Sequence, residues 1–484
     1  MSLQSRIQVA GQDGAEAEAG QEQGKVAAAT ERTSVVSDPF ADLKTRVHKD
    51  IIARLGPRLF NSDPGTGDND LEATVNEAVT EVLALEKTPL TRQERQDIIR
   101  QISDDILGYG PLEPFLRDDS ITEIMVNDCR TIYIERHGKI TRTNAQFVDD
   151  QHLLRIIDKI ISRIGRRIDE SSPYVDARLP DGSRVNAIIP PLAVRGSALT
   201  IRKFRKDPFT MPDLIKFGTL THKSGQFLEA CVRGKLNILI SGGTGSGKTT
   251  TLNVLSAAIP SDERIITVED AAELQLKQEH VITLESRPAN IEGKGQVTIR
   301  DLVRNTLRMR PDRIIIGECR GPETVDMLQA MNTGHDGSLT TVHANNPRDA
   351  LARTETLVLT AGVDLPLRAI REQISSAFDL VVQVSRLVDG TRRITHVTEV
   401  LRMESDVVTL QDVFIAKPVE NAAEQAETGH RLLGPLTCTG IKPHFLDKMA
   451  GNGVNLPPNF FLPETGERTA SASAAGVFGR AVGQ

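Results

Sequence analysis

The chain has 484 residues, of which 39% are hydrophobic and 25% are charged, and its formal net charge is −7. Single hydrophobic cores stop growing well below this length, so we expect about two to four domains. The acidic balance argues against a dedicated nucleic-acid binder, because such proteins usually carry an excess of positive charge.

The cysteines and the apolar residues further limit the class of protein to which the chain can belong. Cys129, Cys231, Cys319 and Cys438 are scattered without a C-x-x-C pair. This argues against a zinc ribbon or a disulfide framework and favours reduced thiols in a cytosolic protein. The amino terminus has no basic region followed by an apolar run, so we see no secretory signal. No apolar stretch approaches the ~20 residues that span a bilayer, so we expect a soluble protein that reaches a membrane only through a partner.

The first part of the chain divides into a tail and a helical segment. Residues 1–38 are rich in Gln, Gly, Ala, Glu and Ser. We expect a disordered tail there, because so little apolar surface cannot offset the entropy of ordering. Residues 39–107 are predicted to be a helical segment, since their apolar residues recur at helical spacing. The first run of these residues is Leu43, Val47, Ile51 and Leu55.

Residues 108–206 are predicted to form an α+β domain, because short β-rich runs alternate with turn signals. The expected strands are at 121–126, 132–134, 184–190 and 199–204. An amphipathic helix is expected among them at 153–164. Residues 207–220 contain Asp-Pro, Met-Pro-Asp and Phe-Gly and are expected to be a linker.

Residues 221–415 alternate between apolar runs and helical patterns, which predicts an α/β fold with a mostly parallel sheet covered by helices. The expected strands are at 236–240, 264–268, 313–316 and 338–343. One helix is expected to begin at Thr298, where Thr298 and Asp301 resemble a capping box. Near the end, a hairpin is predicted to turn at Asp389-Gly390. Residues 416–484 show a fading pattern, and we expect a partly disordered C-terminal extension.

The octapeptide Gly242–Thr249 matches the phosphate-loop pattern G-x-x-x-x-G-K-[ST]. Its glycines let successive N–H groups point at phosphate oxygens, and the following helix adds the positive end of its dipole. Lys248 is expected to reach the β- and γ-phosphates, and the Thr249 hydroxyl to bind Mg²⁺. A chance Gly/Ser linker is the alternative, but a strand before the motif and a helix after it disfavour that alternative. The predicted nucleotide-binding residues are Gly242, Gly243, Thr244, Gly245, Ser246, Gly247, Lys248, Thr249 and Thr250.

Hydrolysis of the nucleotide requires one carboxylate to orient water and another to help hold Mg²⁺. ATP is favoured over GTP, since no Asn-Lys-x-Asp element lies downstream. Glu269-Asp270 and Glu318 follow two predicted strands, and ligands of open α/β sheets bind at such carboxyl ends. A single surface Glu is usually a solvated charge. Two acids at strand ends downstream of a phosphate loop instead predict a role at the nucleotide.

Two histidines and several arginines are further candidates. His335 and His343 have the wrong spacing for a metal pair. Each is either a packed strand histidine or a contact to the γ-phosphate, and the sequence leaves both open. Developing negative charge on the γ-phosphate needs a cation, which Arg320 or an arginine of the predicted α+β domain at 108–206 could supply. The arginines of that domain, most of them expected to be solvated, are Arg178, Arg184, Arg195, Arg202 and Arg205.

Together these residues resemble the ATPase superfamily that drives type II secretion, type IV secretion and type IV pili. Four motifs stand in the family's order: the phosphate loop 242–249, the acidic box 265–270, the second acidic motif 314–320 and the histidine box 333–345. Gly317 stands where most P-loop ATPases carry Asp, and this departure is itself a signature of the superfamily. The segments 175–191 and 199–204, with the helical segment around 39–60, are similar to CpaF-type ATPases of tight-adherence (Flp) pili.

The resemblance implies a fold and a set of residue roles. The fold is a RecA-like P-loop core preceded by a smaller PAS-like α+β domain and an N-terminal helical segment. ATP and Mg²⁺ are the implied cofactors, with Glu269 activating water and Glu318 and Thr249 supporting the metal. The residues implied to contact the nucleotide further are His343, His335, Arg184, Arg202 and Arg178.

The resemblance also implies an assembly and a task. The assembly is a homohexamer in which the strand domain and the core close on ATP about the linker at 207–220. It would be cytoplasmic and peripheral at the inner membrane, where it binds the cytoplasmic domains of polytopic platform proteins without inserting into the bilayer or contacting nucleic acid. The implied task is pilus extension, with retraction open, or protein secretion.

Two other readings stay open. One is a nucleic-acid-stimulated RecA-like motor or a DNA-translocating type IV secretion ATPase, which an arginine-rich helical run invites. That run is Arg300, Arg304, Arg308 and Arg310. At helical spacing such residues more often form salt bridges or a subunit-facing surface. The other is a nucleotide-gated scaffold without activity, which the presence of both Glu269 and Glu318 disfavours.

Overall fold

The computed structural model describes residues 40, 43–44, 46–47, 50–51, 54, 68–86, 88–136, 138–162, 166–204, 207–289, 293–418 and 433–462. The tail expected at 1–38 and the end of the expected C-terminal extension, 463–484, lie outside the described residues. The chain divides into two compact units, Met1–Ser103 and Asp104–Gln484, and each is described by itself.

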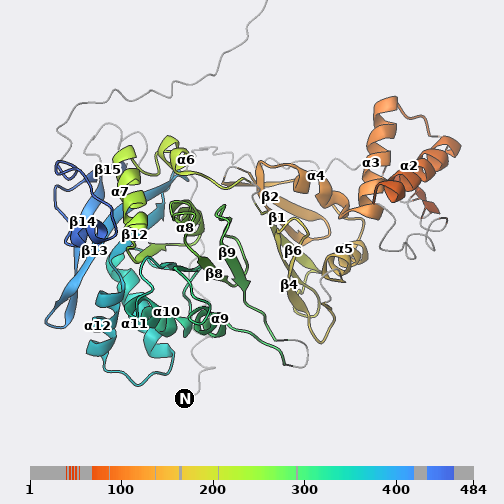
Figure 1. Ribbon diagram of the computed structural model, residues 1–484. Helices are drawn as coiled ribbons and strands as arrows, with labels where there is room; N and C mark the ends of the chain where they lie inside the picture. Colours follow the sequence, from red (N-terminus) through yellow and green to blue (C-terminus); the bar gives the residue numbers. More distant parts are fainter. Residues whose placement is uncertain are drawn as a thin grey trace, which may run out of the picture. The chain divides into compact units, whose positions relative to one another are not determined.

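The described residues of the first unit are mainly helical, in agreement with their apolar spacing. This unit holds α2 (Asp68–Leu85) and the start of α3 (Arg92–Leu107), both drawn in orange in Figure 1. α3 begins after Thr91, which exchanges hydrogen bonds with Glu94 in a capping box. Val75 and Val79 of α2 are fully buried, so the four-residue spacing places one apolar face in the core.

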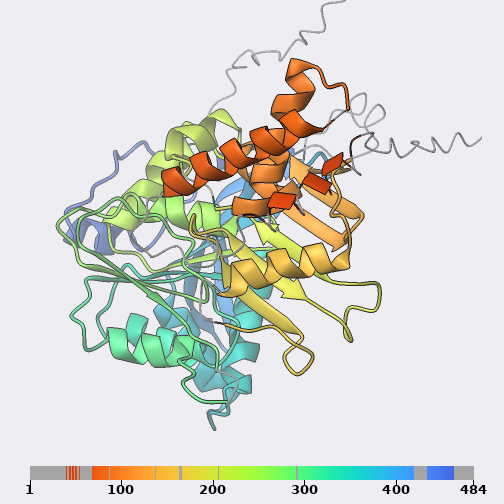
Figure 2. The ribbon, with the colours of Figure 1, turned by 90° about the vertical axis from the view of Figure 1, so that its right-hand side faces the viewer.

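The second unit contains two sheets, of which the first is antiparallel with the strand order β3-β2-β1-β6-β5-β4. Its strands are β1 (Ile121–Asp128), β2 (Thr131–Arg136), β3 (Lys139–Arg142), β4 (Tyr174–Arg178), β5 (Arg184–Ile188) and β6 (Ala198–Arg202). α4 (Glu113–Arg117) precedes them, and α5 (Asp150–Ser162) lies across the strands in Figure 2. Leu153 and Ile157 of α5 share a core cluster with Ile124 of β1. We call residues 108–204 of this unit the strand domain.

The second sheet has the strand order β15-β14-β13-β12-β7-β11-β10-β8-β9. Its strands are β7 (Ile238–Gly242), β8 (Ile265–Glu269), β9 (Val281–Glu285), β10 (Arg313–Ile316), β11 (Leu339–Val342), β12 (Leu380–Arg386), β13 (Arg392–Glu404), β14 (Val407–Pro418) and β15 (Leu433–Cys438). The strands from β12 to β9 run parallel, and β13 to β15 add an antiparallel edge. The predicted mostly parallel sheet is therefore confirmed, as is the hairpin around Asp389-Gly390.

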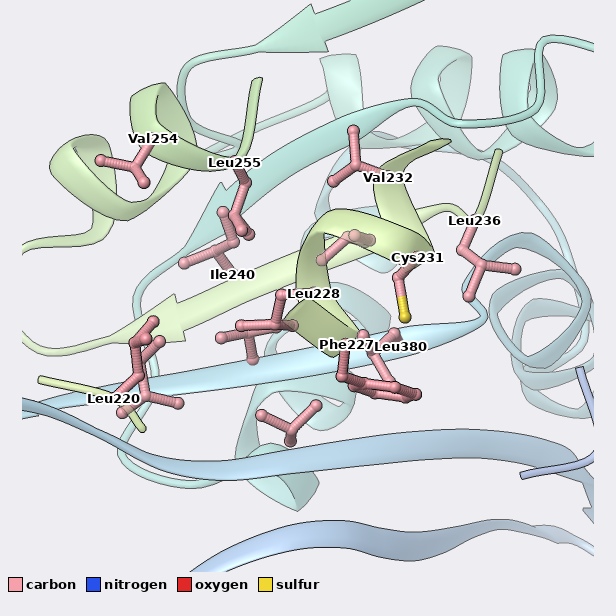
Figure 3. Close-up of a cluster of buried hydrophobic side chains, with 14 of the residues drawn as sticks. Leu220, Phe227, Leu228, Cys231, Val232, Leu236, Ile240, Val254, Leu255 and Leu380 are labelled. Atoms are coloured by element: carbon pink, nitrogen blue, oxygen red, sulfur yellow. The ribbon is translucent and has the colours of Figure 1, made fainter. Parts of the chain in front are cut away.

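Helices pack on both faces of this sheet. They are α6 (Met211–Lys216), α7 (His222–Arg233), α8 (Lys248–Ser256), α9 (Ile299–Thr306), α10 (Glu323–Asn332), α11 (Pro347–Thr360), α12 (Leu367–Ala377) and α14 (Leu446–Gly451). Ile240 of β7 belongs to one core cluster with Leu228 of α7 and Leu255 of α8, which Figure 3 shows. Leu239 belongs to the other cluster, with residues of α9 to α12. β7 therefore buries both faces, as the central strand of a covered parallel sheet does.

The expected linker at 207–220 contains a folded helix. α6 begins after Thr210, whose side chain forms a capping box with Asp213, and a proline follows within the first turn. Met211 and Leu214 are buried in the same core cluster as α7. The Met-Pro-Asp run that indicated a linker is thus the start of a helix, and the segment is attached to the core.

The C-terminal extension contains two elements that the sequence did not reveal. β15 pairs with β14 at the edge of the nine-stranded sheet, where Pro435 is tolerated because an edge strand can leave one N–H unused. Phe445 and Met449, at the start and in the body of α14, are buried in the cluster around Phe227. In the described ranges, no helix is both long and apolar enough to cross a bilayer.

Candidate active site

The phosphate loop connects the end of β7 to the start of α8, at the carboxyl edge of the parallel strands. Gly245 and Gly247 have φ of +68° and +101°, a conformation that other residues adopt only with strain. A Cβ on Gly242 would lie 2.4 Å from the carbonyl oxygen of Val384 on the neighbouring strand. The backbone therefore requires glycine at positions 242, 245 and 247, and α8 presents its amino-terminal N–H groups to this loop.

Lys248 reaches back over the loop. Its ammonium donates a hydrogen bond to the carbonyl of Gly243 at 3.2 Å and lies 3.2 Å from Nδ1 of His343. Burial lowers the pKa of Lys248 from its ordinary value, and the nearby Glu318 carboxylate partly counteracts that shift. A cation held this way, at the mouth of an amide-lined loop, is suited to bind phosphate oxygens.

The two predicted acids lie on adjacent strands. β8 ends at Glu269, and β10, which pairs with β8 in parallel, ends just before Gly317-Glu318. Glu269 is only 3% exposed and accepts hydrogen bonds from the N–H groups of Glu273 and Leu274 at 3.1 and 3.2 Å. Burial raises the pKa of Glu269 to about 7, although these two hydrogen bonds act in the opposite direction. A carboxyl group with a pKa near neutrality can take a proton from water.

Gly317 has a steric role beside Glu269. A Cβ at position 317 would lie 2.8 Å from Cγ of Glu269, closer than real Cβ contacts. An Asp at this position would therefore displace Glu269. The glycine that distinguishes the second acidic motif allows the Glu269 side chain to pass over the end of β10.

Glu318 is held between His343 and Arg320. Its Oε1 lies 2.7 Å from Nε2 of His343, and its Oε2 accepts a hydrogen bond from Arg320 at 2.8 Å. His343 follows β11 directly, so three neighbouring strands contribute to one cluster. Burial lowers the pKa of His343, and the charge of Lys248 lowers it further. The neutral imidazole that results can accept a hydrogen bond from one neighbour while it donates to the other.

A small cavity of about 80 Å³ brings the predicted site residues together. It is lined by Thr249 of the phosphate loop, by Glu269 and Glu318, and by Arg184 and Arg202 of the strand domain. The Thr249 hydroxyl and the Glu318 carboxylate are oxygen donors of the kind that Mg²⁺ binds, with phosphates and waters completing its shell. Among the described residues, no group of three or more His, Cys, Asp or Glu side chains could hold a metal by itself.

The arginines of the strand domain contact the loop that follows β8. Arg184 lies 2.9 Å from Oε1 of Glu273, and Arg202 lies 4.0 Å from the same oxygen. Arg178 forms a 2.8 Å ion pair with Glu285 of β9. The sequence missed Glu273 as a functional residue, because nothing but its place four residues after Glu269 distinguishes it from a surface acid. Arg205 lies outside the described residues.

His335 lies at the opposite end of β11 from His343. It precedes β11, whose first residue, Leu339, is level with Ile238 at the start of β7. The phosphate loop follows the other end of β7, so His335 lies at the amino edge of the sheet and His343 at the carboxyl edge. Within one subunit, the prediction that both histidines contact the γ-phosphate is therefore wrong for His335, because a whole strand separates it from the loop.

Comparisons with known proteins show which family the chain resembles. The model of the type II/IV secretion system protein family matches residues 105–433, and that of the type II secretion system protein E N-terminal domain matches residues 40–107. A putative conjugal transfer protein of Mycobacterium tuberculosis (strain CDC 1551 / Oshkosh) is 36% identical over 341 residues, covering 69% of this chain and 96% of that protein. The conjugal transfer protein TrbB of Rhizobium radiobacter is 33% identical, covering 60% of this chain and 85% of that protein. Among solved structures, one match is the VirB11 ATPase of the Brucella suis type IV secretion system, in complex with sulphate. It is 32% identical, and the match covers 59% of this chain and 91% of the VirB11 chain with a TM-score of 0.33.

Proposed function

The chain belongs to the type II/IV secretion system protein family and is an ATPase, and from that premise we propose that it is a hexameric motor that powers pilus assembly. The single observation that carries the proposal is the cluster around the phosphate loop. Lys248, Glu269 and Glu318 converge there from three separate elements, with Arg184 and Arg202 facing the same cavity. Such an arrangement can bind ATP, orient water and neutralise the charge that develops on the γ-phosphate.

Each residue has a proposed role in hydrolysis. Glu269 takes a proton from the attacking water, for which its pKa of about 7 is suited. Lys248 binds the β- and γ-phosphates. Thr249 and Glu318 would hold Mg²⁺, which would supply further positive charge there. His343 contacts the γ-phosphate in place of its present partner Glu318. Arg184 and Arg202 approach the nucleotide once they leave Glu273.

An ion pair between the two sheets of the second unit supports the proposed motor movement. Arg184 on one sheet and Glu273 beside the other are joined by a 2.9 Å ion pair. ATP would compete with Glu273 for Arg184 and Arg202. Binding of ATP would then draw the strand domain toward the core, and hydrolysis would release the strand domain again. In a homohexamer, this movement would act on the cytoplasmic domain of a platform protein in the inner membrane. The similarity of segments 175–191 and 199–204 to CpaF-type ATPases favours pili of the tight-adherence (Flp) type.

A second candidate function is transfer of DNA or protein in conjugation, which the names of two relatives favour. Direct contact with DNA is the less supported form of this candidate. Arg300 and Arg304 of the arginine-rich helix α9 both form ion pairs with Asp326, at 2.7 and 2.8 Å. Both arginines are therefore engaged with one carboxylate of this chain, as charged residues at helical spacing often are, and that carboxylate compensates part of their charge.

The hydrolytic part of the proposal is tested by phosphate release from the purified protein with ATP and Mg²⁺. We expect Lys248→Ala to abolish release, because the loop loses its phosphate-binding cation. Lys277→Ala, at an exposed lysine outside the site, is the matched control and should keep the wild-type rate. Unchanged hydrolysis in Lys248→Ala would show that the assigned loop is not the site.

The choice between the two tasks is tested in the native host. Cells that carry Lys248→Ala in place of the wild-type gene should lose surface pili and keep DNA transfer if the proposal is correct. The reverse result would favour the conjugative candidate. Stimulation of hydrolysis by DNA that falls steeply with salt would revive a direct nucleic-acid motor.

A further inference from the structure

Two arginines of the β12–β13 hairpin lie against the outside of the phosphate loop. Arg392, the first residue of β13, donates a 3.0 Å hydrogen bond from Nε to the carbonyl of Gly245. Arg386, the last residue of β12, donates to the carbonyl of Gly138 in the β2–β3 turn of the strand domain at 3.2 Å. Neither arginine belongs to the four sequence motifs. Both nevertheless lie beside the loop that binds phosphate.

The hydrogen bond from Arg392 fixes the orientation of one peptide group of the loop. In a trans peptide the carbonyl and the following N–H point in opposite directions. Arg392 binds the Gly245 carbonyl on one side of this peptide, and the N–H of Ser246, on its other side, donates to the carbonyl of Gly243 at 3.3 Å. Gly245 has a φ of +68°, so its flanking peptides have the rotational freedom that such a contact restricts.

The backbone of Arg392 is in turn attached to the end of the segment 207–220, which joins the two sheets. The Thr219 hydroxyl donates to the carbonyl of Arg392 at 2.9 Å. The N–H of Ile394 donates to the carbonyl of Thr219, also at 2.9 Å. Thr219 and Ile394 are both buried. A continuous series of hydrogen bonds thus runs from this segment, through Arg392, to the phosphate loop.

We propose that Arg392 is a positioning residue that fixes the peptide between Gly245 and Ser246 in the phosphate loop and couples the loop to the segment 207–220. A displacement of that segment changes the position of Arg392 and therefore the affinity of the loop for phosphate. Nucleotide binding, by ordering the loop, restrains the segment in return, because coupling between two sites is reciprocal. The inference rests on the proposed binding of ATP at this loop.

The first experiment measures the affinity of the purified full-length protein for a fluorescent ATP analogue, together with kcat and KM for ATP. Arg392→Gln should weaken affinity and raise KM about fivefold, since a charge-assisted but exposed hydrogen bond is lost, and change kcat by less than about twofold. Arg392→Lys should restore affinity to within about twofold, because an ammonium group can still donate to the Gly245 carbonyl. Arg402→Gln, at an exposed arginine further along β13, is the matched control and should behave as wild type.

The second experiment tests the connection to Thr219. Thr219→Val removes the hydroxyl donor at nearly constant volume and should weaken affinity about twofold to threefold. If the two residues act in series, the double variant should be no weaker than Arg392→Gln alone. Equal thermal melting temperatures of all variants would exclude a general loss of folding as the cause.

The outcomes separate this inference from the proposed function. If wild type binds and hydrolyses ATP but Arg392→Gln binds it equally well, the positioning role is overturned and the proposed function stands. Additive effects of Thr219→Val and Arg392→Gln would overturn the coupling alone. If wild type binds no ATP, the proposed function itself fails.

Discussion

The two edges of the nine-stranded sheet use similar charged residues in different ways. At the amino edge, Lys448 of α14 forms ion pairs of 2.8 and 2.9 Å with Asp336 and Asp379. At the carboxyl edge, Glu269 is more deeply buried, at 3% exposure, and accepts its hydrogen bonds from backbone N–H groups. Burial raises the pKa of both Asp379 and Glu269, yet a lysine opposes the shift at Asp379. The difference teaches that the chain gives the buried Asp379 a charged partner, whereas the raised pKa of Glu269 fits the proton-accepting role proposed for it.

The largest expected effect is at the carboxyl edge. Glu269→Gln keeps the size of the side chain but removes its ability to accept a proton. We expect ATP hydrolysis to fall about 10²- to 10³-fold with ATP binding retained, as for loss of a general base. The measurement is phosphate release together with nucleotide affinity, and Glu279→Gln, at an exposed glutamate, is the control. Rapid turnover by Glu269→Gln would remove Glu269 from the catalytic role.

The next effect concerns pH and needs no substitution. Because the pKa of Glu269 is about 7 in the free protein, its carboxyl group is mostly protonated below that pH and cannot accept a proton. We expect kcat/KM for ATP to fall about tenfold per unit below pH 7 and to level off above it, since kcat/KM reports the pKa values of the free enzyme. A profile that stays flat down to pH 5 would contradict the role assigned to Glu269.

The sequence predicts those features of the fold that depend on residues close together along the chain. The phosphate loop, the Thr298 capping box and the Asp389-Gly390 hairpin depend on residues close in sequence, and the structure contains all three. The parallel sheet follows from the alternation of strands and helices. Local residue order also explains why Glu269 and Glu318 lie together, since both follow neighbouring parallel strands.

The features that the sequence could not predict depend on distant residues. Thr219 and Arg392 are 173 residues apart, and Lys448 and Asp336 are 112 residues apart. No local periodicity links such pairs. Each of these residues, taken alone, is of a type that is common on protein surfaces and gives no sign of its partner. The steric reason for Gly317 was hidden in the same way, because it appears only when the side chain of Glu269 is placed over the neighbouring strand.

A third prediction breaks the charge pairing at the amino edge. Lys448→Met leaves Asp379 buried without its lysine. We expect a loss of about 1–2 kcal/mol of unfolding free energy at pH 7, less than for a fully buried pair because the lysine and Asp336 are partly exposed. The midpoint of urea unfolding measures it, and Lys442→Met, at an exposed lysine of the same segment, is the control.

The sign of the pH dependence sharpens this third prediction. Burial raises the folded-state pKa of Asp379, and removal of Lys448 raises it further. A group whose pKa is raised on folding contributes stability at low pH that is lost as the pH rises through its folded-state pKa. The deficit of Lys448→Met relative to wild type should therefore be largest at neutral pH and shrink on acidification toward pH 4. A deficit that grows on acidification would contradict the pairing of Lys448 with Asp379.

The smallest effect is expected at His335, which shares a motif with His343 but lies at the opposite edge of the sheet. His343 lies 2.7 Å from Glu318 and 3.2 Å from Lys248, whereas His335 precedes the other end of β11. We expect His343→Asn to slow ATP hydrolysis about tenfold or more, since a contact to the transferring phosphate is lost. His335→Asn should change the rate by less than about twofold, as for a substitution away from the site. Equal losses in the two variants, with wild-type melting temperatures, would mean that His335 meets a nucleotide held by a neighbouring subunit, and the amino edge would then take part in catalysis across the ring.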